Sequence, residues 1–304
     1  MKRLILEDKI VMLLVFIGAL FRFYNYNSWS LSNDELSAIT RLRFDSFAEM
    51  IEQGVRLTDM HPIGVQSFLW VWTNLFGVNE TMLSLPFVLL GIACIPLLYL
   101  SCKNFFGKFP ALLATAAFVG LEFPILYAQL ARPYSPGLFF SLLVLYSWSE
   151  MMWKNNAWKW KTALLFVMGG IGCMYSHYFS FLFAAIVGLA GVFLIQKQNR
   201  VKYFICGTLM FLFYIPNLNV FLYQFSIGGL GGSEGWLGPP KSDAIWKYIL
   251  YCFNESAFLL LSIIALIVLM LFVFKVKFTW TMKHSLALVF FFITGTHRLL
   301  LFYL

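Results

Sequence analysis

Long apolar segments alternate with short polar segments along the whole chain. Residues 82–102 contain no charged side chain, and Lys103 follows them directly. One helical crossing of a bilayer needs about 20 apolar residues, so this segment predicts a membrane span. Similar segments predict further spans at residues 10–24, 109–127, 135–153, 203–220 (interrupted by Pro216), 256–274 and 285–304.

Residues 162–196 also lack Asp, Glu, Lys and Arg. A single helix of this length would extend roughly 50 Å, against a hydrocarbon core of about 30 Å. The segment therefore predicts two crossings with a turn near His177. Together the segments predict an all-α polytopic membrane protein with about nine transmembrane helices, forming one domain over residues 1–304.

The polar residues 25–81 predict a long external loop that carries interfacial helices. Residues 37–53 place apolar side chains on one helical face, and residues 61–76 form a short apolar run with Trp70 and Trp72 at headgroup depth. Counting residues 61–76 as a crossing would invert every later segment. We therefore predict that both helices lie in the outer interface.

Composition and charge restrict the class of protein further. Apolar residues make up 61% of the chain and charged residues 12%, which excludes a disordered chain, a coiled coil and an ordinary cytosolic enzyme. Most of the 22 basic residues lie in segments that alternate with the external ones, as the positive-inside rule requires. The net charge of +8 thus indicates topology rather than nucleic-acid binding.

The same charge pattern predicts the orientation of the chain. We expect a multi-pass protein with a cytoplasmic N-terminus. Residues 25–81, the Arg132 turn, the His177 turn and the loop 222–247 would then share the external face.

The adjacent acids Asp34 and Glu35 are the first candidates for chemistry. Neighbouring side chains point about 100° apart on a helix, so the two are expected to have different roles. One would act as a base towards a bound substrate, and the other would hold the residues that contact the substrate. Spacing alone favours a solvated helix start, where Asn33 or Asp34 caps the helix and the next acid favours its dipole.

Basic and polar groups of the external face are the next candidates. Pro62 predicts the first helical position of residues 61–76 and leaves His61 at a polar headgroup. Arg132 lies between two predicted spans, where its guanidinium could bind two phosphate oxygens or extend to lipid headgroups. Other candidates are Glu122 near the outer end of a span, His177 in its turn, and Glu234, Trp236 and Lys241 in the loop 222–247.

The order of several short motifs resembles the GT-C membrane glycosyltransferases of the family 39 type, which include protein O-mannosyltransferases and lipid A aminoarabinose transferases. The motifs are Asp34-Glu35, His61-Pro62, Leu83-Ser-Leu-Pro86, the stretch from Leu98 to Lys108, Tyr127-Ala-Gln-Leu-Ala-Arg-Pro-Tyr134, Tyr175-Ser-His-Tyr-Phe179 and Trp236-Leu-Gly-Pro-Pro240. The resemblance covers residues 10–250. Members of this family are usually longer, so the chain is expected to be short or to lack the usual C-terminal portion.

The resemblance implies a polyprenyl-phosphate sugar as donor and a lipid, glycan or protein hydroxyl as acceptor, within membrane lipids and without nucleic acid. It also implies an active site on the outer face of what we expect to be a bacterial inner membrane. Asp34 matches the catalytic carboxylate and Glu35 its partner. His61, Arg132 and Tyr134 match donor phosphate-binding positions, and further substrate contacts are expected from Tyr127, Gln129, His177 and Trp236. Direct displacement predicts inversion, with Asp34 as base.

The resemblance leaves some alternatives open. A lipid-linked-saccharide flippase or another transporter would place polar residues along spans near the membrane midplane. A non-catalytic assembly subunit would not bring Asp34, His61 and Arg132 together. No cofactor is required for either displacement or phosphate release, and His61, His177 and the external acids leave a divalent metal open.

Overall fold

The computed structural model describes residues 6–28, 30–153, 158–227, 242–273 and 281–290. Within these residues every regular element is helical, which confirms the predicted all-α class. The elements are α1 (Leu6–Phe23), α2 (Asn33–Thr40), α3 (Phe47–Glu49), the π-helix η1 (Met50–Arg56), α4 (Ile63–Phe76), α5 (Glu80–Phe106), α6 (Lys108–Gly120), α7 (Glu122–Gln129), α8 (Tyr134–Trp153), α9 (Trp160–Ser176), α10 (Tyr178–Leu194), η2 (Lys197–Asn199), α11 (Arg200–Ser226), α12 (Ala244–Cys252) and α13 (Ala257–Val273).

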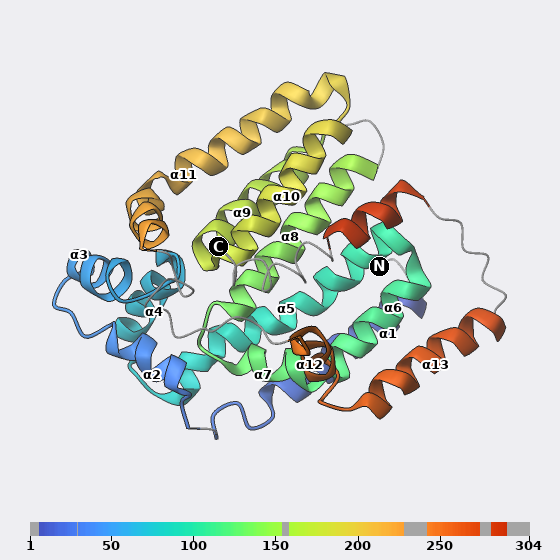
Figure 1. Cartoon of the computed structure of the whole chain (residues 1–304), viewed down its shortest axis with the longest axis horizontal. Helices are drawn as coiled ribbons and strands as arrows, with labels where there is room; N and C mark the ends of the chain where they lie inside the picture. Colours follow the sequence, from blue (N-terminus) through green and yellow to red (C-terminus); the bar gives the residue numbers. More distant parts are fainter. Residues whose placement is uncertain (1–5, 29, 154–157, 228–241, 274–280, 291–304) are drawn as a thin grey trace, which may run out of the picture.

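The centre of the molecule is a bundle in which α8 packs against α5, α9 and α10 (Figure 1). Trp148 on α8 is fully buried, with its ring stacked 6.3 Å from Phe105 and edge-on 5.5 Å from Phe290. Helices α1 and α6 pack on the α5 side, and α11 packs on α9. The short elements α2, η1 and α4 lie between α1 and α5 in the sequence, and they gather at one end of this bundle (Figure 1).

Two described helices are long and apolar enough to cross a membrane, and up to four spans result if each bent pair counts as one. The two are α5 and the continuous helix formed by η2 and α11, and the bent pairs are α6 with α7 and α12 with α13. The turn at His177 is confirmed, since α9 and α10 meet there. The nine predicted crossings are not confirmed, and most of the predicted ninth span lies outside the described residues.

Two of the predicted spans are shaped differently from the prediction. Residues 109–127 break at Leu121, where α6 and α7 meet at 60°, because Leu121 is extended and Pro124 suits the first turn of a new helix. Residues 203–220 are not interrupted, since α11 continues through Pro216. A helix accepts proline when its neighbours satisfy the freed backbone groups.

The helices predicted within residues 25–81 also differ from the prediction. Residues 37–53 are not one helix, because α2 ends at Thr40 and Ser46 caps a new helix through the Glu49 backbone N–H at 3.2 Å. The helix over residues 61–76 is confirmed as α4, although Pro62 is its N-cap rather than its first residue. This shift places His61 in the preceding loop, close to the end of α9.

Gly64 sets the close approach of α4 to α9. A Cβ atom at Gly64 would lie 2.5 Å from the Tyr175 carbonyl oxygen, so Gly64→Ala should force the two helices apart. We expect a loss of about 1–3 kcal/mol in stability, measured as a lower midpoint of thermal unfolding in detergent. Gly207→Ala is the matched control, because no atom lies within 4 Å of that position. An unchanged midpoint for Gly64→Ala would contradict this packing.

Candidate active site

The start of α2 separates the roles of the two adjacent acids. Ser32 caps the helix, and Glu35 Oε2 accepts hydrogen bonds from the Ser32 backbone N–H at 2.9 Å and hydroxyl at 2.8 Å. The predicted cap, Asn33 or Asp34, is therefore wrong. Glu35 Oε1 accepts the Ala131 backbone N–H at 2.8 Å. Glu35 is only 4% exposed. Its Oε2 closes the capping box of α2, and its Oε1 holds α2 against the α7–α8 turn.

Asp34, in contrast, is exposed and lies against the start of α8. The Tyr134 hydroxyl donates to Asp34 Oδ2 at 3.4 Å, and the Tyr134 ring lies edge-on to Tyr127 with 4.7 Å between ring centroids. The Gln129 side-chain amide donates to the carbonyl oxygens of Arg22 and Tyr24. Gln129 thus ties the end of α7 to the end of α1, while Asp34, Tyr127 and Tyr134 lie together.

Asp59 and His61 form a second cluster in the loop between η1 and α4. His61 Nδ1 and Asp59 Oδ1 are 2.8 Å apart, and Arg41 Nη1 lies 3.7 Å from the same oxygen. The Met60 backbone N–H also donates to Asp59 Oδ1, at 2.9 Å. Gln224 on α11 donates to the Asp59 carbonyl oxygen at 2.8 Å, so α11 also holds this loop in place.

These contacts keep the Asp59 carboxylate charged. Burial raises the pKa of Asp59, but the hydrogen bond and charge of His61 and the charges of Arg41 and Arg132 outweigh it and lower the pKa from 3.8 to about 2. Because its pKa is depressed by folding, Asp59 stabilises the folded state above pH 4, and this contribution is lost as pH falls toward 2.

We therefore expect Asp59→Asn to lower the free energy of unfolding by about 2 kcal/mol at neutral pH. The difference from the wild type should be present at pH 5 and shrink below pH 4. Thermal unfolding in detergent across this pH range measures it. A difference as large at pH 3 as at pH 7, or none at pH 7, would contradict this origin.

His61 and His177 meet across the α4–α9 contact. Their ring centroids are 5.1 Å apart, with the rings edge to face. His177 is the N-cap of α10, and its Nδ1 accepts the Phe179 backbone N–H at 3.1 Å. The loop before α4 and the α9–α10 turn thus contribute one imidazole each to the same place.

Arg132 lies close to two groups of residues. The Asp34 cluster consists of Asp34, Tyr127 and Tyr134, and the Asp59 cluster consists of Arg41, Asp59 and His61. Arg132 is 6% exposed in the α7–α8 turn, between Ala131, which is bound to Glu35, and Tyr134, which contacts Asp34. Its positive charge acts on Asp59. Among the described residues, Arg132 Nε has no hydrogen-bond partner. A buried guanidinium with an unused donor is suited to an anion such as a phosphate.

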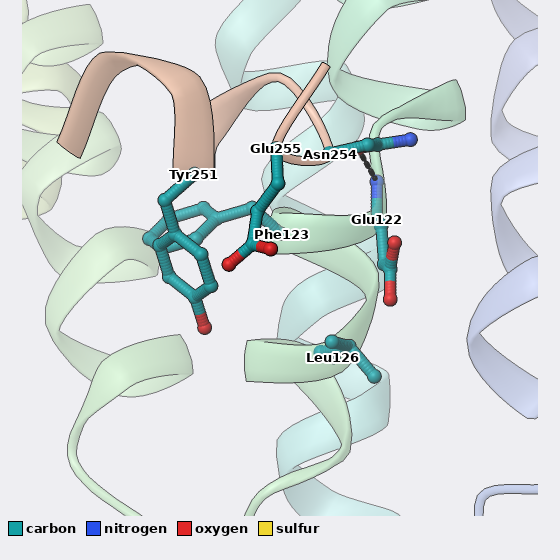
Figure 2. Close-up of a pocket in the computed structure, with 6 residues that line it drawn as sticks. All are labelled: Glu122, Phe123, Leu126, Tyr251, Asn254 and Glu255. Carbon is teal, nitrogen blue, oxygen red and sulfur yellow. Dashed lines mark hydrogen bonds between the residues drawn. The ribbon is translucent and has the colours of Figure 1, made fainter. Parts of the chain in front are cut away.

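A pocket of about 280 Å³ adjoins the Asp34 cluster on the other side. Figure 2 shows its lining, formed by the start of α7 and by α12 and the turn that follows it, with Glu122, Phe123, Leu126, Tyr251, Asn254 and Glu255. Glu122 is exposed at the bend before α7 and does not lie inside a straight span. The Tyr251 hydroxyl lies 3.5 Å from that of Tyr127, which connects the pocket to Asp34 through Tyr134.

The structure brings Asp34, Glu35, Tyr127, Tyr134, Arg132, His61 and His177 into two adjoining clusters, whereas Trp236 lies outside the described residues. Sequence reasoning did not assign Asp59, Arg41 or Tyr251 to the site. For Asp59, the available signal was its position two residues before His61. No sequence pattern near Arg41 or Tyr251 indicated a role in the site. In the part of the chain that is described, no group of three His, Cys, Asp or Glu residues could hold a metal ion.

The comparisons with known proteins bear on the same region. The family model described as dolichyl-phosphate-mannose-protein mannosyltransferase matches residues 60–219, more than half of the 304 residues. The match includes His61, Arg132, Tyr134 and His177, and it begins after Asp34. No curated protein matches the chain.

Proposed function

The chain belongs to the dolichyl-phosphate-mannose-protein mannosyltransferase family, and from that premise we propose that it moves a sugar from a polyprenyl-phosphate donor to an acceptor hydroxyl. Family membership supports a membrane glycosyltransferase of the mannosyltransferase type. The observation that carries the finer proposal is the position of Arg132, buried and with an unused donor, between the exposed Asp34 and the Asp59–His61 pair.

Asp34 is the proposed general base. It is exposed to an incoming acceptor, and its one described hydrogen bond comes from the Tyr134 hydroxyl at 3.4 Å. The second oxygen is therefore available for the proton of the acceptor hydroxyl. A positioned carboxylate of this kind contributes about 10²–10⁴-fold to a displacement.

Arg132 and His61 are the proposed partners of the donor phosphate. Direct displacement at the anomeric carbon leaves a polyprenyl phosphate, whose growing charge needs fixed donors. Arg132 supplies a guanidinium in a site of low exposure, and His61 is held in place through Nδ1 by Asp59 at 2.8 Å. His177, 5.1 Å from His61 by ring centroids, adds a second imidazole beside it.

The use of Glu35 supports an inverting displacement. A retaining reaction needs two carboxylates about 5 Å apart that both act on the substrate. Both oxygens of Glu35 already accept hydrogen bonds, from Ser32 and Ala131. Asp34 is then left as the single reactive carboxylate of the pair, as a single displacement requires.

The proposed orientation places this site on the extracytoplasmic face, with α8, α9 and α10 as crossings in addition to the long helices. Glu7, at the start of α1, contacts Lys103 and Lys108 at the junction of α5 and α6, whereas the other end of α1 leads to α2 and the site. Basic residues thus gather at the end of α1 that is remote from Asp34. The positive-inside rule favours the cytoplasm for that end.

The test is transfer by the purified full-length chain from a polyprenyl-phosphate mannose of defined anomeric configuration. We expect a glycosylated product whose anomeric configuration is opposite to that of the donor, measured by NMR of the new linkage. A product that retains the configuration would contradict the single displacement, and the absence of transfer to lipid, glycan and peptide hydroxyls alike would contradict the proposed function.

A further inference from the structure

The pocket between α7 and α12 lies where two bent helix pairs meet. Helices α6 and α7 bend by 60° at Leu121, and α12 and α13 bend by 71° at the turn that holds Asn254. Asn254 Oδ1 accepts the Glu122 backbone N–H at 2.9 Å and joins the two bends directly (Figure 2). The pocket is therefore part of the helix architecture and not a gap between unrelated segments.

Its walls combine aromatic faces with negative charge. The rings of Phe123 and Tyr251 meet edge-on at 5.3 Å, and the Glu255 carboxylate points toward them in Figure 2. Glu122 supplies a second carboxylate, and neither acid has an ion-pair partner among the described residues. Among the residues that the structure describes, no Lys or Arg lines the pocket, so this lining attracts cations and repels anions.

A series of tyrosine contacts connects this pocket to the proposed base. The Tyr251 hydroxyl is 3.5 Å from the Tyr127 hydroxyl, and the Tyr127 ring is 4.7 Å from the Tyr134 ring. Tyr134 in turn donates to Asp34 at 3.4 Å. A molecule seated in the pocket would therefore extend toward Asp34 along an aromatic wall.

The charges on the two sides of Asp34 are opposite. On one side lie Arg41, Arg132 and His61, which suit the anionic phosphate of a donor. On the other side lie the carboxylates of Glu122 and Glu255 together with the rings of Phe123 and Tyr251. Carboxylates and aromatic rings together bind ammonium groups through charge and through the ring faces. Charge separation of this kind keeps an anionic donor out of the second position.

We propose that the α7–α12 pocket binds an ammonium group of the acceptor, so that the acceptor carries a positive charge close to the hydroxyl that receives the sugar. The role as acceptor subsite rests on the proposed function of Asp34, whereas the preference for a cation does not. A volume of about 280 Å³ suits a small substituted ammonium group and its neighbouring hydroxyl.

Serinol and glycerol provide a matched pair of probes, because they share one carbon skeleton and differ only in an ammonium group in place of the central hydroxyl. We expect the full-length protein in detergent to bind serinol about five- to tenfold more tightly than glycerol, measured by saturation-transfer NMR titration. Added salt should reduce the preference. Serinol, and not glycerol, should also compete with the acceptor in the transfer assay.

The double variant Glu122→Gln with Glu255→Gln should abolish the preference for serinol. The matched control is Glu49→Gln with Glu80→Gln, which makes the same change of charge at exposed positions outside the pocket and should leave the preference unchanged. Equal binding of the two probes, no binding of serinol, or a preference that survives in the pocket variant would overturn the proposal. Asp34→Asn should keep the preference, so a failure of the proposed catalytic role would be seen separately as transfer that persists in that variant.

Discussion

Asp34→Asn should reduce the rate of sugar transfer by about 10²–10⁴-fold while leaving the protein folded. The amide keeps the shape of the side chain and can still accept the Tyr134 hydroxyl hydrogen bond, but it cannot take the proton of an acceptor hydroxyl. Single-turnover transfer from a polyprenyl-phosphate mannose measures the effect, and the midpoint of thermal unfolding in detergent checks the fold. The loss should appear in kcat, because binding of the donor is centred on Arg132.

Asp45→Asn is the matched control for this variant. Asp45 is an exposed carboxylate in the segment that follows α2, so the control makes the same change of charge outside the contacts of Asp34. It should keep the wild-type rate. Wild-type transfer by Asp34→Asn would remove Asp34 from the mechanism, and an equal loss in both variants would indicate a general effect of surface charge.

The long-range pattern of apolar residues predicted the helices well. The charge-free segments gave α5, α13 and the division of residues 162–196 into α9 and α10, because a run of apolar side chains is unfavourable in water over its whole length. The pattern could not predict the break at Leu121 or the passage of α11 through Pro216. Pro124 is a local signal for the break, but the Glu122 backbone N–H at the break is bound by Asn254, which is distant in sequence. Passage through Pro216 depends on partners for the freed backbone groups, and that information is not local.

The candidate site was predictable in its residues more than in its contacts. The resemblance to a known family assigned Asp34, His61 and Arg132 to an external site for a phosphate and a hydroxyl, and this assignment stays a prediction. Asp34 and Glu35 differ because Glu35 accepts a hydrogen bond from the backbone N–H of Ala131. Ala131 is distant in sequence from Glu35, and only its backbone takes part. Any residue except proline presents that group, so no sequence pattern could have marked it.

The Asp59–His61 pair shows a different limit. A carboxylate two residues before a histidine is common. Here burial raises the pKa of Asp59, but His61, and to a smaller extent the charges of Arg41 and Arg132, lower it further than burial raises it. Gln224 on α11 holds the same loop through the Asp59 carbonyl oxygen. Four segments that are far apart along the chain therefore determine the orientation of one imidazole.

Arg132→Gln should lower kcat/KM for transfer by about 10²–10³-fold, the usual effect of removing one donor that stabilises developing charge. Arg132 is buried, so its replacement by a neutral side chain leaves the departing phosphate without a nearby guanidinium in a region of low exposure. Arg132→Lys keeps the charge but loses the planar fork, and it should fall between the wild type and Arg132→Gln. Steady-state transfer over a range of donor concentrations measures both variants.

Arg43→Gln is the control for Arg132, because Arg43 is exposed in the same external segment and its loss changes the net charge equally. The two variants should also differ toward free polyprenyl phosphate, the leaving product. Inhibition by that product should weaken in Arg132→Gln and stay unchanged in Arg43→Gln, since only Arg132 would contact the phosphate. If product inhibition is equal in the two variants, Arg132 does not bind the phosphate, and its buried position between Ala131 and Tyr134 would serve only to hold the α7–α8 turn.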